Sequence, residues 1–174
     1  TLVSGCLPPS QSGTGTVVWG SLWEPSSLNP IVAPDVVTKW IMENIFDGLV
    51  AINDKMEIVP ELADSWDVSP DGKIYTFRLR KGVKWHDGQP FSSADVKATF
   101  DRVLHPDFKS PKCGASLKPM VASVEAVDPN TVTFQLKFPA APFLPSVASA
   151  WCRIAAKHVL AKYGDLNAPE AQIG

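Results

Sequence analysis

Two adjacent residues of this chain have the side chains that general acid–base chemistry uses. His86 is followed directly by Asp87, so an imidazole stands beside a carboxylate. His105 and His158 are the other two imidazoles, and no serine or cysteine forms a recognisable nucleophile–histidine–aspartate spacing with any of the three. The sequence also has no Gly-x-Ser-x-Gly nucleophile elbow. We therefore interpret His86 as a turn residue after a strand and predict no enzyme; a secreted hydrolase that uses His86 and Asp87 is the rival hypothesis.

Metal chemistry has equally little support. Neither Cys113 nor Cys152 has the close cysteine or histidine spacing of a zinc site, and no Glu/His/Asp pattern suggests another metal, so we expect no metal and no cofactor. In an oxidising compartment Cys113 and Cys152 can form a disulfide. The alternative is two separate buried thiols, and the sequence alone does not show whether the two side chains meet.

The third cysteine, Cys6, lies near the start of the sequence. Thr1–Cys6 ends in Val-Ser-Gly-Cys, which resembles the lipobox of bacterial lipoproteins, where the cysteine is lipidated after signal-peptide cleavage. The charged region and most of the apolar region of a signal peptide are not in the sequence. Leu7–Gly15 is rich in Pro, Ser and Gly, as flexible linkers are. We expect residues 1–15 to be a lipobox-like start and tether with Cys6 as the lipidation site; the alternative is a chance Gly-Cys pair in a disordered start.

The clearest secondary-structure pattern runs from Ser69 to Pro106. Ser69–Gly72 has the residues of a tight turn, and apolar and polar residues then alternate over 74–80, which predicts a half-buried strand. Asp87-Gly88 predicts a second turn. Ser92–Asp95 resembles a capping box and predicts a helix that Pro106 ends.

The remaining elements are shorter. Residues 121–127 and 131–138 predict a hairpin, while Pro34-Asp35 predicts the start of a helix whose apolar face is 37, 41, 45 and 49. We also predict strands at 16–20, 50–52 and 151–155, and helices at 143–148 and 157–163, the last closed by Gly164. Trp40, Trp66 and Trp85 are expected in the core.

The composition bounds the class of protein. The 174 residues have a net charge of −2 with both signs interspersed, which argues against a nucleic-acid partner. No run of about 18 apolar residues predicts a membrane-spanning helix. Blocks of hairpins and helices, punctuated by 16 prolines, indicate an α+β fold rather than a helical bundle.

An ordered set of motifs after the tether resembles one protein family. The motifs are Leu28-Asn29-Pro30, Asp47-Gly48-Leu49-Val50, Pro60-Glu61-Leu62-Ala63, Trp66, Asp71-Gly72-Lys73, Tyr75-Thr76-Phe77-Arg78-Leu79-Arg80, Gly82-Val83-Lys84-Trp85-His86-Asp87-Gly88, Ala94-Asp95-Val96, Val124-Glu125-Ala126-Val127-Asp128, Ala141-Pro142-Phe143-Leu144 and Ile173-Gly174. In this order they are similar to the N-terminal part of family 5 extracellular solute-binding proteins, the dipeptide-, oligopeptide- and nickel-binding receptors of bacterial ABC importers. Any one motif alone would be weak, but the ordered set is specific.

The resemblance implies a clamshell of the type II periplasmic-binding-protein kind, in which two lobes close on a ligand. Family members are much longer than this chain, so the resemblance implies a fragment with an incomplete α/β-like first lobe. We expect residues 16–40 to be the first-lobe strand and cleft loop. Residues 41–165 would be mainly the family's extra α+β subdomain with hairpins, and 166–174 would return to the first lobe, truncated.

The resemblance also suggests which residues contact a solute. Trp23 lies in the irregular loop after the predicted first strand, and Asp35 and Val36 align with a region that lines the cleft in the family. Arg153 would face a carboxylate, and Trp151 would cap an apolar side chain. For each tryptophan the alternative is ordinary core packing, and the family's chief ligand anchors lie outside this sequence.

The function that the resemblance implies is capture of a di- or oligopeptide and its delivery to an ABC permease. The implied location is the periplasm or the outer face of the cytoplasmic membrane, with a possible lipid anchor. The implied partners are a peptide or other small solute, the permease subunits and the membrane, with no nucleic acid. The alternatives are a nickel chelate, haem or another solute in the same fold, or a relative that has become a sensor or chaperone.

Overall fold

A computed structural model of the chain describes residues 20, 23–32, 35–164 and 166–174. The predicted tether at 1–15, Cys6 within it, and all but the last residue of the predicted strand at 16–20 lie outside the described residues.

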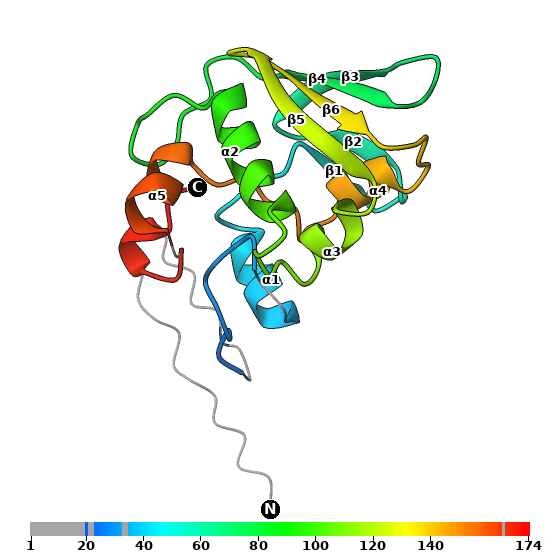
Figure 1. The fold of residues 1–174 in the computed structure, drawn as a ribbon. Coiled ribbons are helices and arrows are strands. Elements are labelled where there is room, and N and C mark those ends of the chain that lie inside the picture. Colours follow the sequence, from blue (N-terminus) through cyan, green and yellow to red (C-terminus); the bar gives the residue numbers. More distant parts are fainter. Residues whose placement is uncertain (1–19, 21–22, 33–34, 165) are drawn as a thin grey trace, which may run out of the picture.

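A four-stranded antiparallel sheet is the largest regular part of the fold. Its strands are ordered β3 (Ala63–Val68), β4 (Ile74–Leu79), β6 (Thr131–Leu136) and β5 (Val121–Asp128), and helix α2 (Ser93–Leu104) packs against β5 and β6 (Figure 1). The strands predicted at 74–80, 121–127 and 131–138 and the helix before Pro106 are therefore confirmed, and so is the α+β class.

The core lies between this sheet and α2. Phe77 and Phe134 are fully buried neighbours on β4 and β6, with ring centroids 5.6 Å apart, and Phe100 of α2 packs 4.9 Å from Phe134. Edge-on contacts of this kind add to the stabilisation from burying apolar area. The alternating pattern identified these positions correctly, except that Phe138 lies beyond the end of β6 and is half exposed.

The start of α2 is fixed by its own side chains. Asp95 accepts a hydrogen bond from the backbone N–H of Ser92 at 2.8 Å, which satisfies a donor that the helix itself cannot use. The second carboxylate oxygen of Asp95 accepts from Lys157 N at 2.8 Å, at the beginning of α5 (Lys157–Tyr163). The capping residue therefore also connects two helices.

Helix α1 (Val36–Met42) begins where predicted but is shorter. The predicted apolar face at 37, 41, 45 and 49 is wrong, because the buried positions are Thr38 and Met42 and the helix ends before Asn44. The side chain of Asn44 donates to the carbonyl of Trp40 at 2.7 Å, which is the carbonyl that the backbone N–H of Asn44 would use if the helix continued. Trp40 is half exposed, so its predicted place in the core is also wrong, whereas Trp85 is buried and Trp66 is partly buried.

A separate two-stranded ribbon follows α1. Strand β1 (Val50–Ile52), which was predicted, pairs antiparallel with β2 (Ile58–Pro60). The remaining elements are α3 (Cys113–Leu117), α4 (Phe143–Val147), α5 and the short 3₁₀ helix η1 (Pro169–Ala171). The predicted helices at 143–148 and 157–163 are confirmed, and Gly164 closes α5 with a positive φ of 65°, which glycine adopts without strain.

The predicted strand at 151–155 is wrong. The N–H of Ile154 donates to the carbonyl of Asp47, and the N–H of Ala155 donates to the hydroxyl of Thr99 at 3.0 Å. These donors are satisfied by the carbonyl of a residue between α1 and β1 and by a side chain instead of a neighbouring strand, so the segment does not belong to a sheet.

Candidate functional site

A hollow of about 440 Å³ lies between α1, the end of β1 and the segment that follows α4. It contains two of the five residues that sequence analysis assigned to solute contact, Trp151 and Arg153, which makes it the candidate site. Its lining combines charged, hydroxyl and apolar groups, as small-molecule sites in proteins do. The lining residues are Lys39, Glu43, Ala51, Ile52, Pro145, Ala148, Ser149, Ala150, Trp151 and Arg153.

Arg153 is held by two carboxylates of the protein. Its Nη1 lies 3.0 and 3.2 Å from the two oxygens of Glu61, and its Nη2 lies 3.5 Å from Oε1 of Glu43. Glu43 in turn pairs with Lys39 at 3.4 Å. Arg153 is 8% exposed, and a charge buried to this extent requires such partners. A ligand carboxylate would therefore have to compete for Arg153 with Glu43, the more distant of the two partners.

Glu61 extends this network to the backbone. Its Oε2 accepts from Gly48 N at 2.8 Å, and a Cβ on Gly48 would lie only 3.0 Å from that oxygen, so glycine permits the close approach. Burial raises the pKa of Glu61 above its ordinary value, while the charge of Arg153 and the Gly48 N–H act in the opposite direction. Residues Ser149–Arg153 form one wall of the hollow. Arg153 connects this wall to α1 through Glu43 and to the end of the β1–β2 ribbon through Glu61.

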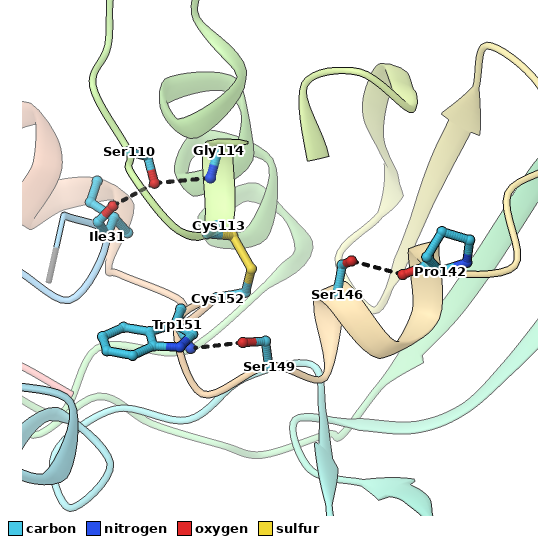
Figure 2. Close-up of a disulfide and its surroundings, with 9 residues drawn as sticks. All are labelled: Ile31, Ser110, Cys113, Gly114, Pro142, Ser146, Ser149, Trp151 and Cys152. Atoms are coloured by element: carbon cyan, nitrogen blue, oxygen red, sulfur yellow. Dashed lines mark hydrogen bonds between the residues drawn. A yellow bond between two sulfur atoms is a disulfide. The ribbon is translucent and has the colours of Figure 1, made fainter. Parts of the chain in front are cut away.

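Trp151 lies on that wall beside a disulfide. Cys152, the next residue, is bonded to Cys113 at the start of α3 (Figure 2). The ammonium of Lys112 stands 5.5 Å from the ring centroid of Trp151, and the backbone N–H of Trp151 donates to Ser149 Oγ at 3.4 Å. The indole is partly buried and so keeps some surface for contact with a solute.

The other three predicted contacts lie away from the hollow. Asp35 caps α1: its oxygens accept from Thr38 N at 2.9 Å and Thr38 Oγ1 at 2.8 Å, and also from Ser26 Oγ. These hydrogen bonds, that from Ser26 foremost, lower the pKa of Asp35 to about 2. Val36, the first residue of α1, is 52% exposed and Trp23 is 72% exposed, so both present apolar surface.

The adjacent His86 and Asp87 do not form an acid–base pair. Asp87 instead lies 2.7 Å from Nε2 of His158 on α5, while His86 exchanges hydrogen bonds with the backbone of Gly174. Within the described part of the chain, no group of three or more His, Cys, Asp or Glu side chains is placed to hold a metal ion. In the same part, no helix combines the length and apolar composition that a membrane span requires.

The sequence did not indicate Lys39, Glu43, Ser149 or the partnership of Glu61 with Arg153. The four-residue spacing of Lys39 and Glu43 on a predicted helix is the one signal that could have indicated a surface pair. Glu61 and Arg153 are 92 residues apart, and no local pattern connects them.

Comparison with known proteins identifies the family. Residues 57–173 match the bacterial extracellular solute-binding proteins of family 5, middle region. The glutathione-binding protein GsiB of Pectobacterium atrosepticum is 35% identical over 139 residues, which are 80% of this chain and 27% of GsiB. The chain thus spans little more than a quarter of that relative.

Solved structures of binding proteins are also similar to this chain. The periplasmic binding protein DppA of Helicobacter pylori, in complex with the peptide STSA, is 36% identical with a TM-score of 0.71, over 79% of this chain and 30% of DppA. The binding protein AgaA from A. tumefaciens R10, in complex with agropinic acid, is 35% identical with a TM-score of 0.75, over 83% of this chain and 29% of AgaA. These relatives are solute-binding proteins and not enzymes, which confirms the prediction of no enzyme and sets the hydrolase hypothesis aside. The family match covers residues 57–173, which are more than half of the chain. The chain therefore belongs to the bacterial extracellular solute-binding proteins of family 5.

Proposed function

We propose that the intact protein captures a di- or oligopeptide outside the cytoplasmic membrane and delivers it to the permease of an ABC importer. The observation that carries the proposal is the likeness, at 36% identity, to a binding protein in complex with the peptide STSA. The glutathione-binding relative supports it, because glutathione is itself a small peptide. The agropinic acid complex favours one competitor, a small organic acid that is not a peptide.

The chemistry of the hollow suits a peptide. A peptide offers backbone donors and acceptors together with side chains of mixed polarity. The hollow sets Ser149 and the Lys39–Glu43 pair beside apolar Ile52, Pro145 and Trp151. Apolar walls supply affinity through buried area, and a few placed polar groups orient the ligand.

The five candidate residues receive different roles in this proposal. Trp151 contacts the solute in the hollow through its apolar surface. Val36 and Trp23 lie outside the hollow and are candidates for solute contact only through their exposed apolar side chains. Asp35 acts by holding the first turn of α1, and Arg153 by holding the wall that carries Trp151. Arg153 would bind a ligand carboxylate only if that carboxylate replaced Glu43 as its partner.

The proposal extends to the organisation of the protein. We place residues 16–40 in the first lobe, 41–165 mainly in the extra subdomain and 166–174 in the return to the first lobe. Residues 1–15 would be a tether with a lipid on Cys6, which would hold the protein at the outer face of the membrane. Mass spectrometry of the protein isolated from its membrane fraction tests the last point, since a diacylglycerol on Cys6 adds a defined mass.

Titration calorimetry of the intact protein against di- to pentapeptides tests the function. We expect saturable binding of at least one peptide with a negative heat-capacity change, the mark of apolar burial. Trp151→Phe should weaken that binding. Trp66→Phe is the matched control, because Trp66 packs against Phe77 in the sheet at 6.4 Å between centroids, away from the hollow.

Nickel chelates, haem and agropinic acid belong in the same titration as competitors. Tight binding of one of these, with no peptide bound, would replace the peptide proposal by a different solute in the same fold. Binding of none of them would contradict the proposed function altogether.

A further inference from the structure

The segment that carries Trp151 is positioned mainly by side chains. The backbone N–H groups of Trp151 and Cys152 both donate to Ser149, only two or three residues away. The next backbone bond that leaves the segment is the one from Ile154 N to Asp47 O, at 2.9 Å. Bonds to a residue in the same turn shape the segment locally but do not fix its place in the fold.

Two neighbouring cross-links join this segment to the start of α3. One is the covalent bond between Cys113 and Cys152, which are 39 residues apart in the sequence. The other is the contact of the Lys112 ammonium with the ring of Trp151, which involves the residue before each cysteine. Figure 2 shows Trp151 next to the bridged Cys152, with its indole extending away from the sulfur–sulfur bond.

The start of α3 is itself anchored, so the cross-links hold Trp151 against a fixed point. Ser110 Oγ donates to the carbonyl of Ile31 at 2.8 Å and accepts from Gly114 N at 3.0 Å (Figure 2). A Cβ on Gly114 would approach Cβ of Ser110 to 2.7 Å, so the two residues are packed too closely for any side chain larger than that of glycine at position 114. Ile31 lies in the loop that leads to α1. The disulfide therefore sets the indole relative to α3 and, through Ser110, to the loop before α1.

A small cavity gives access to the sulfur bridge. It has a volume of about 150 Å³ and is bordered by both cysteines, Lys112 and Trp151. The cysteines are 3% and 2% exposed, so a small reductant fits this route better than a folded protein does. The positive charge of Lys112 at this cavity favours approach of an anionic thiolate. Trp151 borders this cavity on one side and the candidate site on the other.

We infer that the redox state of Cys113 and Cys152 controls the position of Trp151 and thereby the affinity of the hollow for its solute. The inference about affinity rests on the proposed function; the inference about position does not. A small thiolate attacks one sulfur, forming a mixed disulfide and releasing the other cysteine as a thiolate. A second thiolate attacks the reductant's sulfur in this mixed disulfide and displaces the remaining cysteine. The reductant leaves as its own disulfide, two electrons pass to the protein, and both cysteine thiolates take up protons to become thiols.

Reduction of the intact protein by dithiothreitol, with Trp151 fluorescence and peptide affinity followed together, tests this inference. The emission of Trp151 is obtained as the difference between the protein and its Trp151→Phe variant. We expect a shift to longer wavelength and about tenfold weaker peptide binding, within the range that couplings between sites span. Cys113→Ser/Cys152→Ser should reproduce both effects and show no further response to dithiothreitol.

Unchanged Trp151 emission in the fully reduced protein would overturn the inference. The inference would also be overturned if reduction abolished the near-ultraviolet circular dichroism of the aromatic rings packed in the sheet at the same time as it changed Trp151. The disulfide would then stabilise the whole fold and would not act specifically on the position of Trp151. The circular dichroism measurement needs only the reduced native protein, so it tests the inference even if the double cysteine variant does not fold. If the oxidised protein binds no peptide, the proposed function fails, while the emission shift still tests the link between the disulfide and Trp151.

Discussion

The four-stranded sheet and the wall that carries Trp151 are held in place by different interactions. The sheet has continuous backbone pairing across β3, β4, β6 and β5, and its inner face packs a group of phenylalanine rings against α2. The wall, Ser149–Arg153, has local backbone bonds, one disulfide, one cation–ring contact and the ion pairs of Arg153.

This difference bears on how each region responds to change. Many small contacts support the sheet, so its stability is shared among residues and its geometry resists local perturbation. Few and individually strong links support the wall, so one substitution can move it. The candidate site is built on the second kind of support.

The largest effect is expected in the sheet. Phe134→Ala removes a fully buried ring that packs against Phe77, Phe100 and Phe143, and should lower the free energy of unfolding by about 4 kcal/mol. Peptide affinity of the molecules that remain folded should change little, because the ring lies away from the hollow. Urea denaturation and calorimetry on the same samples measure the two quantities.

Phe138→Ala is the control for this prediction, since the same side chain is 49% exposed there. It should cost well under about 1 kcal/mol, as most surface substitutions do. Similar losses at the two positions would show that the ring cluster is not the main support of the sheet.

A smaller loss of stability but a larger loss of binding is expected in the wall. Arg153→Met leaves Glu61 partly buried without its partner. Breaking a fully buried pair costs about 3–5 kcal/mol; because the Glu61 side chain is 21% exposed, we expect about 2 kcal/mol. Peptide affinity should fall as well, because Arg153 holds the residues next to Trp151.

Arg80→Met is the matched control, since Arg80 pairs with Asp64 at 3.1 Å but both side chains are at least half exposed. Its effect on stability should stay below about 1 kcal/mol, with binding unchanged. If Arg153→Met altered stability alone, Arg153 would support the fold without positioning the site.

The same contrast explains what could be predicted from the sequence. The alternation of Tyr75, Phe77 and Leu79 is a local signal with the period of a strand, and burial on one face follows directly from it. Asp95 and Gly164 are likewise local signals for the start and end of a helix. Turn and cap chemistry acts over a few residues, which is the range that a pattern can reveal.

The wall could not be predicted in this way. Residues 151–155 have the composition of a strand, but whether they pair depends on a neighbouring strand that the fold does not provide. Trp40 looks like a core residue by type, yet the short helix α1 turns Thr38 and Met42 inward instead. The link from Arg153 to Glu61 joins distant parts of the sequence, so only the assembled fold reveals it.

The smallest effect is expected at Asp35, in the loop region that precedes the site. Replacing this helix cap by alanine should cost about 1 kcal/mol. Asp35→Asn keeps a capping side chain but removes the charge, so near neutral pH it should cost less than Asp35→Ala. Guanidinium denaturation of the three proteins at pH 7 gives these differences.

The contribution of the Asp35 charge to the free energy of unfolding should depend on pH in the acid range. Its pKa falls from 3.8 to about 2 on folding, so between these values the unfolded chain binds more protons than the folded one. The stabilisation is therefore complete above about pH 4 and is lost as the pH falls toward 2. The stability difference between the protein and Asp35→Asn should shrink over that interval, because the variant has no carboxylate to protonate. A difference that stays constant from pH 5 to about pH 2 would show that the hydroxyl of Ser26 and the N–H of Thr38 do not favour the ionised form of Asp35.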